Sequence, residues 1–525
     1  MRDRCEVLDW AASGAMALTG LPEGPPVASP APTLAMLAQV SAELARVTST
    51  MGNEVRADPA ELIAGRAALA GFTRGGRVSA GGSSFLLRAA DGWCAVTLSR
   101  PDDVAAVPAI AGLLGTDGAC GNGRVTLAQA RSALTVAALA TPAEDFAAAA
   151  QLLGVPAAAL PAGARPPSAR PSSAQPDSAP PHSAPPHGAV GGSRAWAASW
   201  PPWRATRIAA PLAGAGLAGT GLAGTALTGT ALTGTALTGT GLTGTGLTGT
   251  ALTGAGLTGT RLDNTVVADL SSMWAGPLCA RLLGLAGAQV IKVESPGRPD
   301  GARAGNREFF DWLHAGHRSL SLDFSTRAGR AVLASLLEVA DVVIESSRPR
   351  ALAALGVAPG MIRHPPGQVW LSITGYGRSL PERVAFGDDA AVAGGLVGWP
   401  EGERAGGEPP GPVFCADAIA DPLTGACGAL AVALSRSAGG GELIDLAMRD
   451  VAAAFAAAPD HGAPDHGSHD IRPGGSVVCP RSRREQAVLA PRRPAPPAGP
   501  AGHAAELGAD TSAVLAWLAG RRAAC

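Results

Sequence analysis

Aromatic and charged residues are scarce in this 525-residue sequence. Aromatics make up 4% and charged residues 16%, with one tyrosine, Tyr376, and one lysine, Lys292. The formal net charge is −1 and no basic block is present. Nothing therefore draws the chain electrostatically to nucleic acid or to an anionic membrane, and neither is an expected partner.

Several signals of location and cross-linking are also missing. No run of about 18 apolar residues occurs, which excludes a transmembrane helix, and Glu6 and Asp9 interrupt the apolar core that a signal peptide needs. The eight cysteines are widely scattered and form no C-x-x-C pair. We therefore expect a cytoplasmic protein with reduced thiols, without a disulfide framework or a zinc site.

Glycine and proline are abundant, with 70 and 44 residues, and they help to divide the chain. We predict a small α+β region over 1–160, a linker over 161–262, an α/β domain over 263–458, a disordered stretch over 459–500 and a C-terminal helix over 501–525. The first half of the linker is rich in Pro, Ser and His, a composition that buries too little apolar surface to fold. The His-rich run 461–470 has no rigid geometry, so no metal is expected there.

The second half of the linker is an internal repeat. Leucines recur every five residues from Leu212 to Leu262, eleven in all. This period does not keep leucine on one helical face. A pentapeptide-repeat β-helix would place Ala two residues before the central Leu, where threonine is the commoner residue here. A flexible linker is the favoured interpretation, and a β-helix is the alternative.

Apolar strand patterns alternate with helical patterns in 263–458. Strands are predicted at 265–270, 289–294, 341–345 and 369–374, with helices between them. This alternation predicts right-handed βαβ units and a Rossmann-like, mostly parallel sheet covered by helices. Ligands gather at the carboxyl ends of such strands, which places 271–276, 294–297, 346–350 and 375–378 around one rim.

Several common catalytic motifs are absent from this domain. The first strand is not followed by G-x-G-x-x-G, and there is no Walker A lysine, G-x-S-x-G elbow or H-E-x-x-H. The segment Asp269-Leu-Ser-Ser-Met-Trp-Ala-Gly-Pro-Leu-Cys, followed by Leu285-Ala-Gly-Ala-Gln-Val-Ile-Lys-Val-Glu, instead resembles the opening of the family III CoA-transferases. Four later segments fit in order: Arg318-Ser-Leu-Ser-Leu-Asp, Ala340-Asp-Val-Val-Ile-Glu, Leu371-Ser-Ile-Thr-Gly-Tyr-Gly and Cys415-Ala-Asp-Ala-Ile-Ala-Asp-Pro-Leu-Thr-Gly.

The resemblance implies an acyl-CoA:carboxylate CoA-transferase that works through an aspartyl anhydride and an aspartyl-CoA thioester. By position in Ala418-Ile-Ala-Asp-Pro-Leu-Thr-Gly the nucleophile is Asp421. A covalent intermediate divides one difficult step into two easier ones. The residues alone allow another interpretation, in which Asp421 only caps the following helix.

The resemblance also implies contacts with CoA and indicates which reaction to expect. The predicted CoA-binding residues are Ser272, Met273, Trp274, Ala275, Ser346, Arg348, Arg350, Gly375 and Tyr376. CoA is expected as a substrate, with an acyl-CoA donor and a carboxylic acid acceptor, and no permanently bound cofactor or metal is expected. Racemases of this family carry a histidine before the aspartate where this chain has Asp388 and Asp389. A racemase or isomerase is therefore the second interpretation, and a degenerate, non-catalytic CoA-binding protein is the third.

The first 160 residues resemble a second fragment of the same family. Ala90-Asp-Gly-Trp-Cys-Ala-Val-Thr-Leu resembles a strand of the family's small domain, and Asp9–Gly24 echoes Asp388–Gly402. This fragment has no counterpart of Asp421. We expect it to pack against the catalytic core, within the chain or across a dimer, with an inert vestige as the alternative. Family members are typically homodimers, which makes a homodimer the expectation here.

Overall fold

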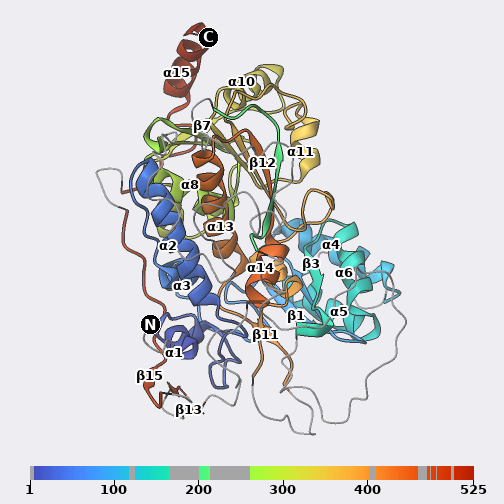
Figure 1. Cartoon of the computed structure of the whole chain (residues 1–525). Coiled ribbons are helices and arrows are strands. Elements are labelled where there is room, and N and C mark those ends of the chain that lie inside the picture. The colour runs from blue at the N-terminus through green and yellow to red at the C-terminus, as the bar shows by residue number, and fades with distance from the viewer. Residues whose placement is uncertain are drawn as a thin grey trace, which may run out of the picture.

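The computed structural model of the chain describes residues 5–116, 125–164, 200–212, 261–400, 410–458, 470–472, 475–479, 482–497 and 502–524. Its centre is a seven-stranded sheet with the strand order β4-β12-β9-β8-β5-β6-β7 (Figure 1). Neighbouring strands are parallel except β4 and β12, which run antiparallel. The predicted α/β class with a mostly parallel sheet is confirmed. The strands are β4 (Trp203–Arg207), β5 (Val266–Asp269), β6 (Gln289–Glu294), β7 (Arg318–Ser321), β8 (Val342–Glu345), β9 (Val369–Thr374) and β12 (Glu442–Ala447).

Both faces of this sheet are buried, because alternate residues of its apolar strands enter two different cores. In β8, for example, Val342 and Ile344 join the core that contains α8 and α13, whereas Val343 joins the core that contains α10. This explains why the strands read as continuous apolar runs. The helices of the first core are α8 (Ala275–Leu285), α9 (Arg307–His314), α13 (Ala420–Ser437) and α14 (Met448–Ala456), and those of the second are α10 (Arg327–Leu337), α11 (Pro349–Ala354) and α15 (Thr511–Ala524).

The N-terminal region contributes two separate parts (Figure 1). Helices α1 and α2 and part of α3 join the core of α8 and α13, and α2 lies directly against α13. A three-stranded antiparallel sheet, β1-β2-β3, builds a small core of its own with three helices. The elements are α1 (Glu6–Ala12), η1 (Met16–Leu18), α2 (Thr33–Met51), α3 (Pro59–Ala70), β1 (Ser84–Arg88), β2 (Trp93–Thr97), α4 (Pro101–Leu113), α5 (Leu127–Ala140), α6 (Ala143–Leu152), β3 (Ala157–Ala159) and η2 (Ala162–Ala164).

A short helix, α12, connects the small sheet of the N-terminal region to the core of the main sheet, and a two-stranded hairpin follows it. Helix α12 contacts both β2 and β3 of the small sheet as well as α13 and α14 of the main core. It follows the glycine loop after β9 and precedes the hairpin of β10 and β11, which leads directly into α13. The bounds are α12 (Gly387–Ala393), β10 (Val397–Gly398) and β11 (Val413–Phe414).

Some elements lie in stretches that the sequence predicts to be a linker, 161–262, or disordered, 459–500. Strand β4 falls within the predicted linker 161–262 and extends the main sheet by pairing with β12. Three short strands, β13 (Asp470–Arg472), β14 (Ser476–Val478) and β15 (Glu485–Ala487), form a small sheet within 459–500. The leucine repeat 213–260 and most of the His-rich run lie outside the described residues. Of the helices that are described, none is both long and apolar enough to cross a membrane.

Candidate active site

Asp421 occupies the second position of α13 and points away from its own helix. Helix α13 has Ile419 at its N-cap position and no side-chain cap there. The Asp421 carboxylate instead accepts a hydrogen bond from the backbone amide of Ala275, at the start of α8. Its Oδ2 atom would lie 2.3 Å from a Cβ atom at Gly387 in α12. The carboxylate therefore sits where three helices meet, and it is not the cap of α13.

A strained turn precedes α13 and sets the position of the site. Ala416 has φ 55° and Ala418 has φ 44°, in the left-handed region that residues with a Cβ atom rarely adopt. The backbone amides of both alanines are fixed by hydrogen bonds to side chains outside the turn. Ala416 donates to Oγ1 of Thr19 at 2.9 Å, and Ala418 donates to Oδ1 of Asp388 at 3.1 Å. This turn holds Asp417, which is fully buried, between the two alanines.

Two further aspartates of α12 adjoin the site, and the small sheet supplies hydroxyl groups to both. Ser84 Oγ lies 2.9 Å from Oδ2 of Asp388, and Thr97 Oγ1 lies 2.9 Å from Oδ1 of Asp389. Burial, reinforced by the charge of Asp417, raises the pKa of Asp388 to about 6. Burial also raises the pKa of Asp389 to about 8. At neutral pH Asp389 is therefore mostly protonated, whereas Asp388 is mostly ionised.

Asp421 itself combines burial with partial access. Asp421 is half-buried, whereas Asp388 and Asp389 are only 8% and 0% exposed. Desolvation raises the pKa of Asp421 to about 7, the nearby charge of Arg66 opposes that rise, and Asp388 and Asp417 add to it. A carboxylate with this pKa is partly ionised at neutral pH and weakly hydrated, which suits nucleophilic attack.

The loop after β5 carries four of the predicted CoA-binding residues, and the structure brings this loop to Asp421. Ser272 is exposed and Met273 is 37% exposed with φ 74°, whereas Trp274 and Ala275 are buried. The Ser272 amide donates to the Ser346 hydroxyl at 3.1 Å. Two of the four side chains thus lie at the surface of the rim, and Ala275 contacts the candidate nucleophile through its backbone.

A buried ion pair fixes the shape of this loop. Lys292, at the centre of β6, binds Asp300 Oδ2 at 2.9 Å and also donates to the carbonyl of Ser271. Asp300 in turn accepts a hydrogen bond from the amide of Met273 at 3.0 Å. The pKa of Asp300 is lowered, because the Lys292 ammonium group outweighs the effect of burial. The chain's one lysine is therefore a positioning residue for the loop.

Two further arginines, Arg100 and Arg298, lie near the predicted residues Arg348 and Arg350. The pKa of Arg348 is lowered by burial and then by the positive charges of Arg350, Arg100 and Arg298. Arg350 pairs with Glu382 at 2.5 Å on the surface, and Arg100 belongs to the N-terminal region. Two of these guanidinium groups already have carboxylate partners, since Arg350 binds Glu382 and Arg100 binds Asp103 at 2.8 Å. Contact of Arg348 and Arg350 with CoA stays a prediction.

Gly375 and Tyr376, also predicted to bind CoA, are closely packed against other parts of the chain. Tyr376 is 4% exposed, and its hydroxyl donates to the carbonyl of Ala157 in β3 at 3.2 Å. Gly375 packs against Ala385, so that a Cβ atom there would lie 2.8 Å from the Ala385 Cβ. These two residues join the main domain to the small sheet, and their contact with CoA stays a prediction.

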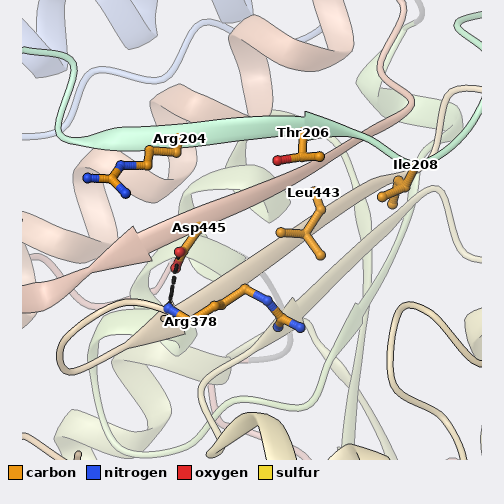
Figure 2. A pocket seen from close by; sticks show the side chains of 6 residues that line it. All are labelled: Arg204, Thr206, Ile208, Arg378, Leu443 and Asp445. Atoms are coloured by element: carbon orange, nitrogen blue, oxygen red, sulfur yellow. Dashed lines mark hydrogen bonds between the residues drawn. The ribbon is translucent and has the colours of Figure 1, made fainter. Parts of the chain in front are cut away.

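One cavity lies elsewhere on the main sheet. It has a volume of about 340 Å³ and is lined by Arg204, Thr206 and Ile208 of β4, Leu443 and Asp445 of β12, and Arg378 after β9 (Figure 2). The backbone amide of Arg378 donates to the Asp445 carboxylate, and its guanidinium group pairs with Glu345 at 3.1 Å. None of these residues belongs to the group around Asp421. Among the described residues, no three His, Cys, Asp or Glu side chains are placed to hold a metal ion.

Comparison with known proteins finds similarity in the main domain. The model of CoA-transferase family III matches residues 262–476. Succinate–glutarate CoA-transferase from Agrobacterium fabrum is 33% identical over 214 residues, which cover 36% of this chain and 52% of that protein. Formyl-CoA:oxalate CoA-transferase from Escherichia coli O139:H28 is 30% identical over 206 residues, which cover 36% of this chain and 48% of that protein.

A solved structure of a CaiB/BaiF family protein from Brucella suis is 30% identical, with a TM-score of 0.32, and the match covers 37% of this chain and 55% of that one. The chain therefore spans only about a third to a half of the length of the curated relatives that it matches, with values of 33%, 38% and 52% for three of them. Residues 262–476 of this chain, about two fifths of its length, are thus similar to CoA-transferase family III.

Proposed function

We propose that this protein is an acyl-CoA:carboxylate CoA-transferase in which Asp421 is the nucleophile. The observation that carries the proposal is the position of Asp421 in the matched domain. Its carboxylate is partly exposed and accepts a hydrogen bond from Ala275, the last residue of the loop predicted to bind CoA. Its pKa of about 7 leaves a reactive carboxylate at neutral pH without a separate general base.

The proposed reaction proceeds through four exchanges at carbonyl carbons. The Asp421 carboxylate attacks the thioester of the donor, the C–S bond breaks, and an aspartyl anhydride and the CoA thiolate form. The thiolate attacks the aspartyl carbonyl and releases the donor acid, which leaves an aspartyl-CoA thioester. The acceptor carboxylate then attacks this thioester to form a new anhydride and free thiolate. Attack of the thiolate on the acceptor carbonyl gives the new acyl-CoA and regenerates Asp421.

The groups around Asp421 are suited to a reaction in which negative charge moves between carboxylate groups and the CoA thiolate. The backbone amide of Ala275 is positioned to stabilise negative charge on the aspartyl oxygen. We propose that Ser272 and Met273 line the path of CoA, and that Arg348 and Arg350 bind its phosphates together with Arg100 and Arg298. Bidentate guanidinium contacts are well suited to phosphate groups.

The geometry favours transfer over racemisation. A racemase needs two acid–base groups that can reach the substrate α-carbon. Asp388 stands where racemases of this family carry histidine, but Ser84 and the Ala418 amide already bond to its two oxygens, and it is buried. Both carboxylate oxygens of Asp388 are therefore occupied by hydrogen bonds within the protein. This leaves Asp421 as the accessible carboxyl group.

Intact-protein mass spectrometry after incubation with a panel of acyl-CoAs tests the proposal. Wild type should gain the mass of CoA less one water, and hydroxylamine should remove the adduct. Asp421→Asn should form none, whereas Asp145→Asn, at an exposed site in α6, should behave as wild type. A folded wild type that binds CoA without forming any adduct would contradict the proposal and support a non-catalytic CoA-binding protein. Exchange of the substrate α-proton in deuterated water, without an adduct, would support an isomerase.

A further inference from the structure

One charged residue of the N-terminal region reaches the surroundings of Asp421. Arg66, on α3, forms a two-pronged ion pair with Asp417, with Nε at 2.8 Å from Oδ2 and Nη2 at 2.5 Å from Oδ1. The two residues are 351 positions apart in the sequence. Figure 1 shows α3 beside α13, and the two helices are in contact. Paired guanidinium and carboxylate planes fix both groups in one orientation.

Arg66 also packs against the loop predicted to bind CoA. Its guanidinium carbon lies 4.7 Å from the ring centroid of Trp274, which in turn meets Phe309 edge to face at 5.3 Å. Trp274 directly precedes Ala275, whose amide bonds to Asp421. Arg66 therefore touches both peptide segments that hold the nucleophile, the turn before α13 and the loop before α8. Cation–π contacts of this kind gain strength when they are desolvated.

Three charged residues face Asp421, each from a different segment. Asp388 comes from α12, Asp417 from the turn before α13, and Arg66 from α3. The two aspartates disfavour a negative charge on Asp421, and the Arg66 guanidinium favours one. The Arg66 guanidinium thus opposes the rise in the Asp421 pKa that burial and the neighbouring carboxylates cause.

We infer that Arg66 is a positioning residue for the CoA-transfer reaction: its ion pair with Asp417 and its stacking on Trp274 hold the turn before α13 and the loop before α8 in place around Asp421. The inference rests on the proposed function. It makes the N-terminal region an integral part of the active site, because the main domain alone supplies neither the partner of Asp417 nor the positive charge of Arg66. The alternative, that this region is an inert vestige, would leave the reaction unaffected by Arg66.

The test compares the pH dependence of CoA-adduct formation in the full-length chain. Arg66→Gln should move the midpoint of the rate upward by about one pH unit and lower the rate at pH 7 about fivefold. Asp417→Asn removes a negative charge and should move the midpoint downward. Arg46→Gln breaks a surface ion pair with Glu43 in α2 and should leave the midpoint unchanged. Opposite shifts in the first two variants cannot arise from a general loss of stability.

A further variant separates charge from geometry. Arg66→Lys keeps the charge but loses the fork that pairs with Asp417. It should keep the wild-type midpoint with a lower maximal rate. The inference is wrong if wild type forms the adduct and Arg66→Lys and Arg66→Gln share one midpoint, or if Arg66→Gln and Asp417→Asn both keep the midpoint of wild type. Absence of the adduct from wild type at every pH would instead contradict the proposed function itself.

Discussion

At the scale of single residues, the site depends on keeping carboxyl groups away from water. Asp388, Asp389 and Asp417 are each less than 9% exposed, and Asp421 lies beside them. Carboxyl groups this close cannot all ionise without strong mutual repulsion. Arg66 compensates for one charge by pairing with Asp417. The remaining groups respond by holding protons at higher pH, which makes both reactivity and stability depend on pH.

Replacing Asp389 should expose this dependence directly. Its pKa is raised from 3.8 to about 8 by burial, so the folded state binds a proton that the unfolded state has released. The stability associated with this proton is complete below pH 3.8 and is lost as the pH rises through about 8. For one group the slope reaches at most about 1.4 kcal/mol per pH unit. Asp389→Asn should therefore lose less stability than wild type between pH 5 and pH 8.

Urea denaturation at both pH values measures the effect. Asp145→Asn is the matched control, because it removes the same group at an exposed position in the first turn of α6. It should follow wild type at both pH values. Parallel loss of stability in Asp389→Asn and wild type would contradict a raised pKa at Asp389.

The sequence predicted Asp421 as the nucleophile, but it did not predict the surroundings of that residue. The order of motifs identified the helix that carries Asp421 and the loop that carries Ala275, and the structure brings these two together. Arg66 and Ser84 lie in a region without any catalytic motif, and they meet their partners across more than 300 residues. Contacts over such separations depend on tertiary packing, which no local pattern encodes. Asp388 was recognised in the sequence only through the histidine that it replaces.

At the scale of elements, helix packing brings α8 against α13 and so brings Ala275 to Asp421. Helix α13 is apolar on nearly all sides, as expected for a helix enclosed by the sheet, α8, α14 and α2. Close approach to α8 requires a small residue at Gly425, where a Cβ atom would lie 2.7 Å from the Ala275 carbonyl oxygen and 2.9 Å from Leu278 Cβ. This glycine is needed for space, because its backbone is helical.

Two glycine-to-alanine changes in helices should have opposite effects. Gly425→Ala should destabilise the protein by about 1–3 kcal/mol, because the added methyl group pushes α13 away from α8. Gly520→Ala in α15 meets no atom within 4 Å and should stabilise by about 0.5–1 kcal/mol through helix propensity. Urea denaturation measures both. An equal gain in stability from the two changes would contradict the tight α8–α13 contact.

The main strands and helices were predictable because each has a local signature. Short apolar runs identified β5, β6, β8 and β9, and helical patterns lay between them. Strand β4 was not recognised, since it lies beside a Pro-rich stretch and is defined by the edge of β12 with which it pairs. A strand of this kind is stabilised by its partner, so its own residues carry little signal.

At the scale of the whole molecule, one hydrophobic core joins segments from both ends of the chain. Leu37 and Leu44 of α2 belong to the same core as Leu278 of α8 and Leu430 of α13. Polar contacts add to it at the small sheet, where Gln151 Nε2 donates to the Val384 carbonyl at 2.7 Å. The N-terminal region packs within the chain, as one of the two predicted arrangements requires. The predicted homodimer stays a prediction, and light scattering of the full-length chain tests it.

The two halves should therefore remain associated when the chain between them is cut. A protease site inserted in the repeat between residues 213 and 260 allows cleavage into two pieces, one of which carries α1–α6 and β4. These pieces should co-elute in gel filtration, because the shared core, the β4–β12 pairing and the Arg66–Asp417 ion pair connect them. The cleaved protein should also keep its CoA-adduct formation, since Arg66 stays in place.

The same experiment distinguishes an integral core from loose contact. Leu44→Ala removes a side chain that is 1% exposed and should weaken the association of the pieces by about 2–5 kcal/mol, so that they separate on dilution. Leu139→Ala, at a side chain in α5 that is 56% exposed, should leave them together. If the cleaved wild type already separates at micromolar concentration, the N-terminal region is tethered to the main domain and does not share its core. Co-elution that persists in Leu44→Ala at every dilution would instead place the binding energy in the β4–β12 pairing, because that contact is unaffected by the change in α2.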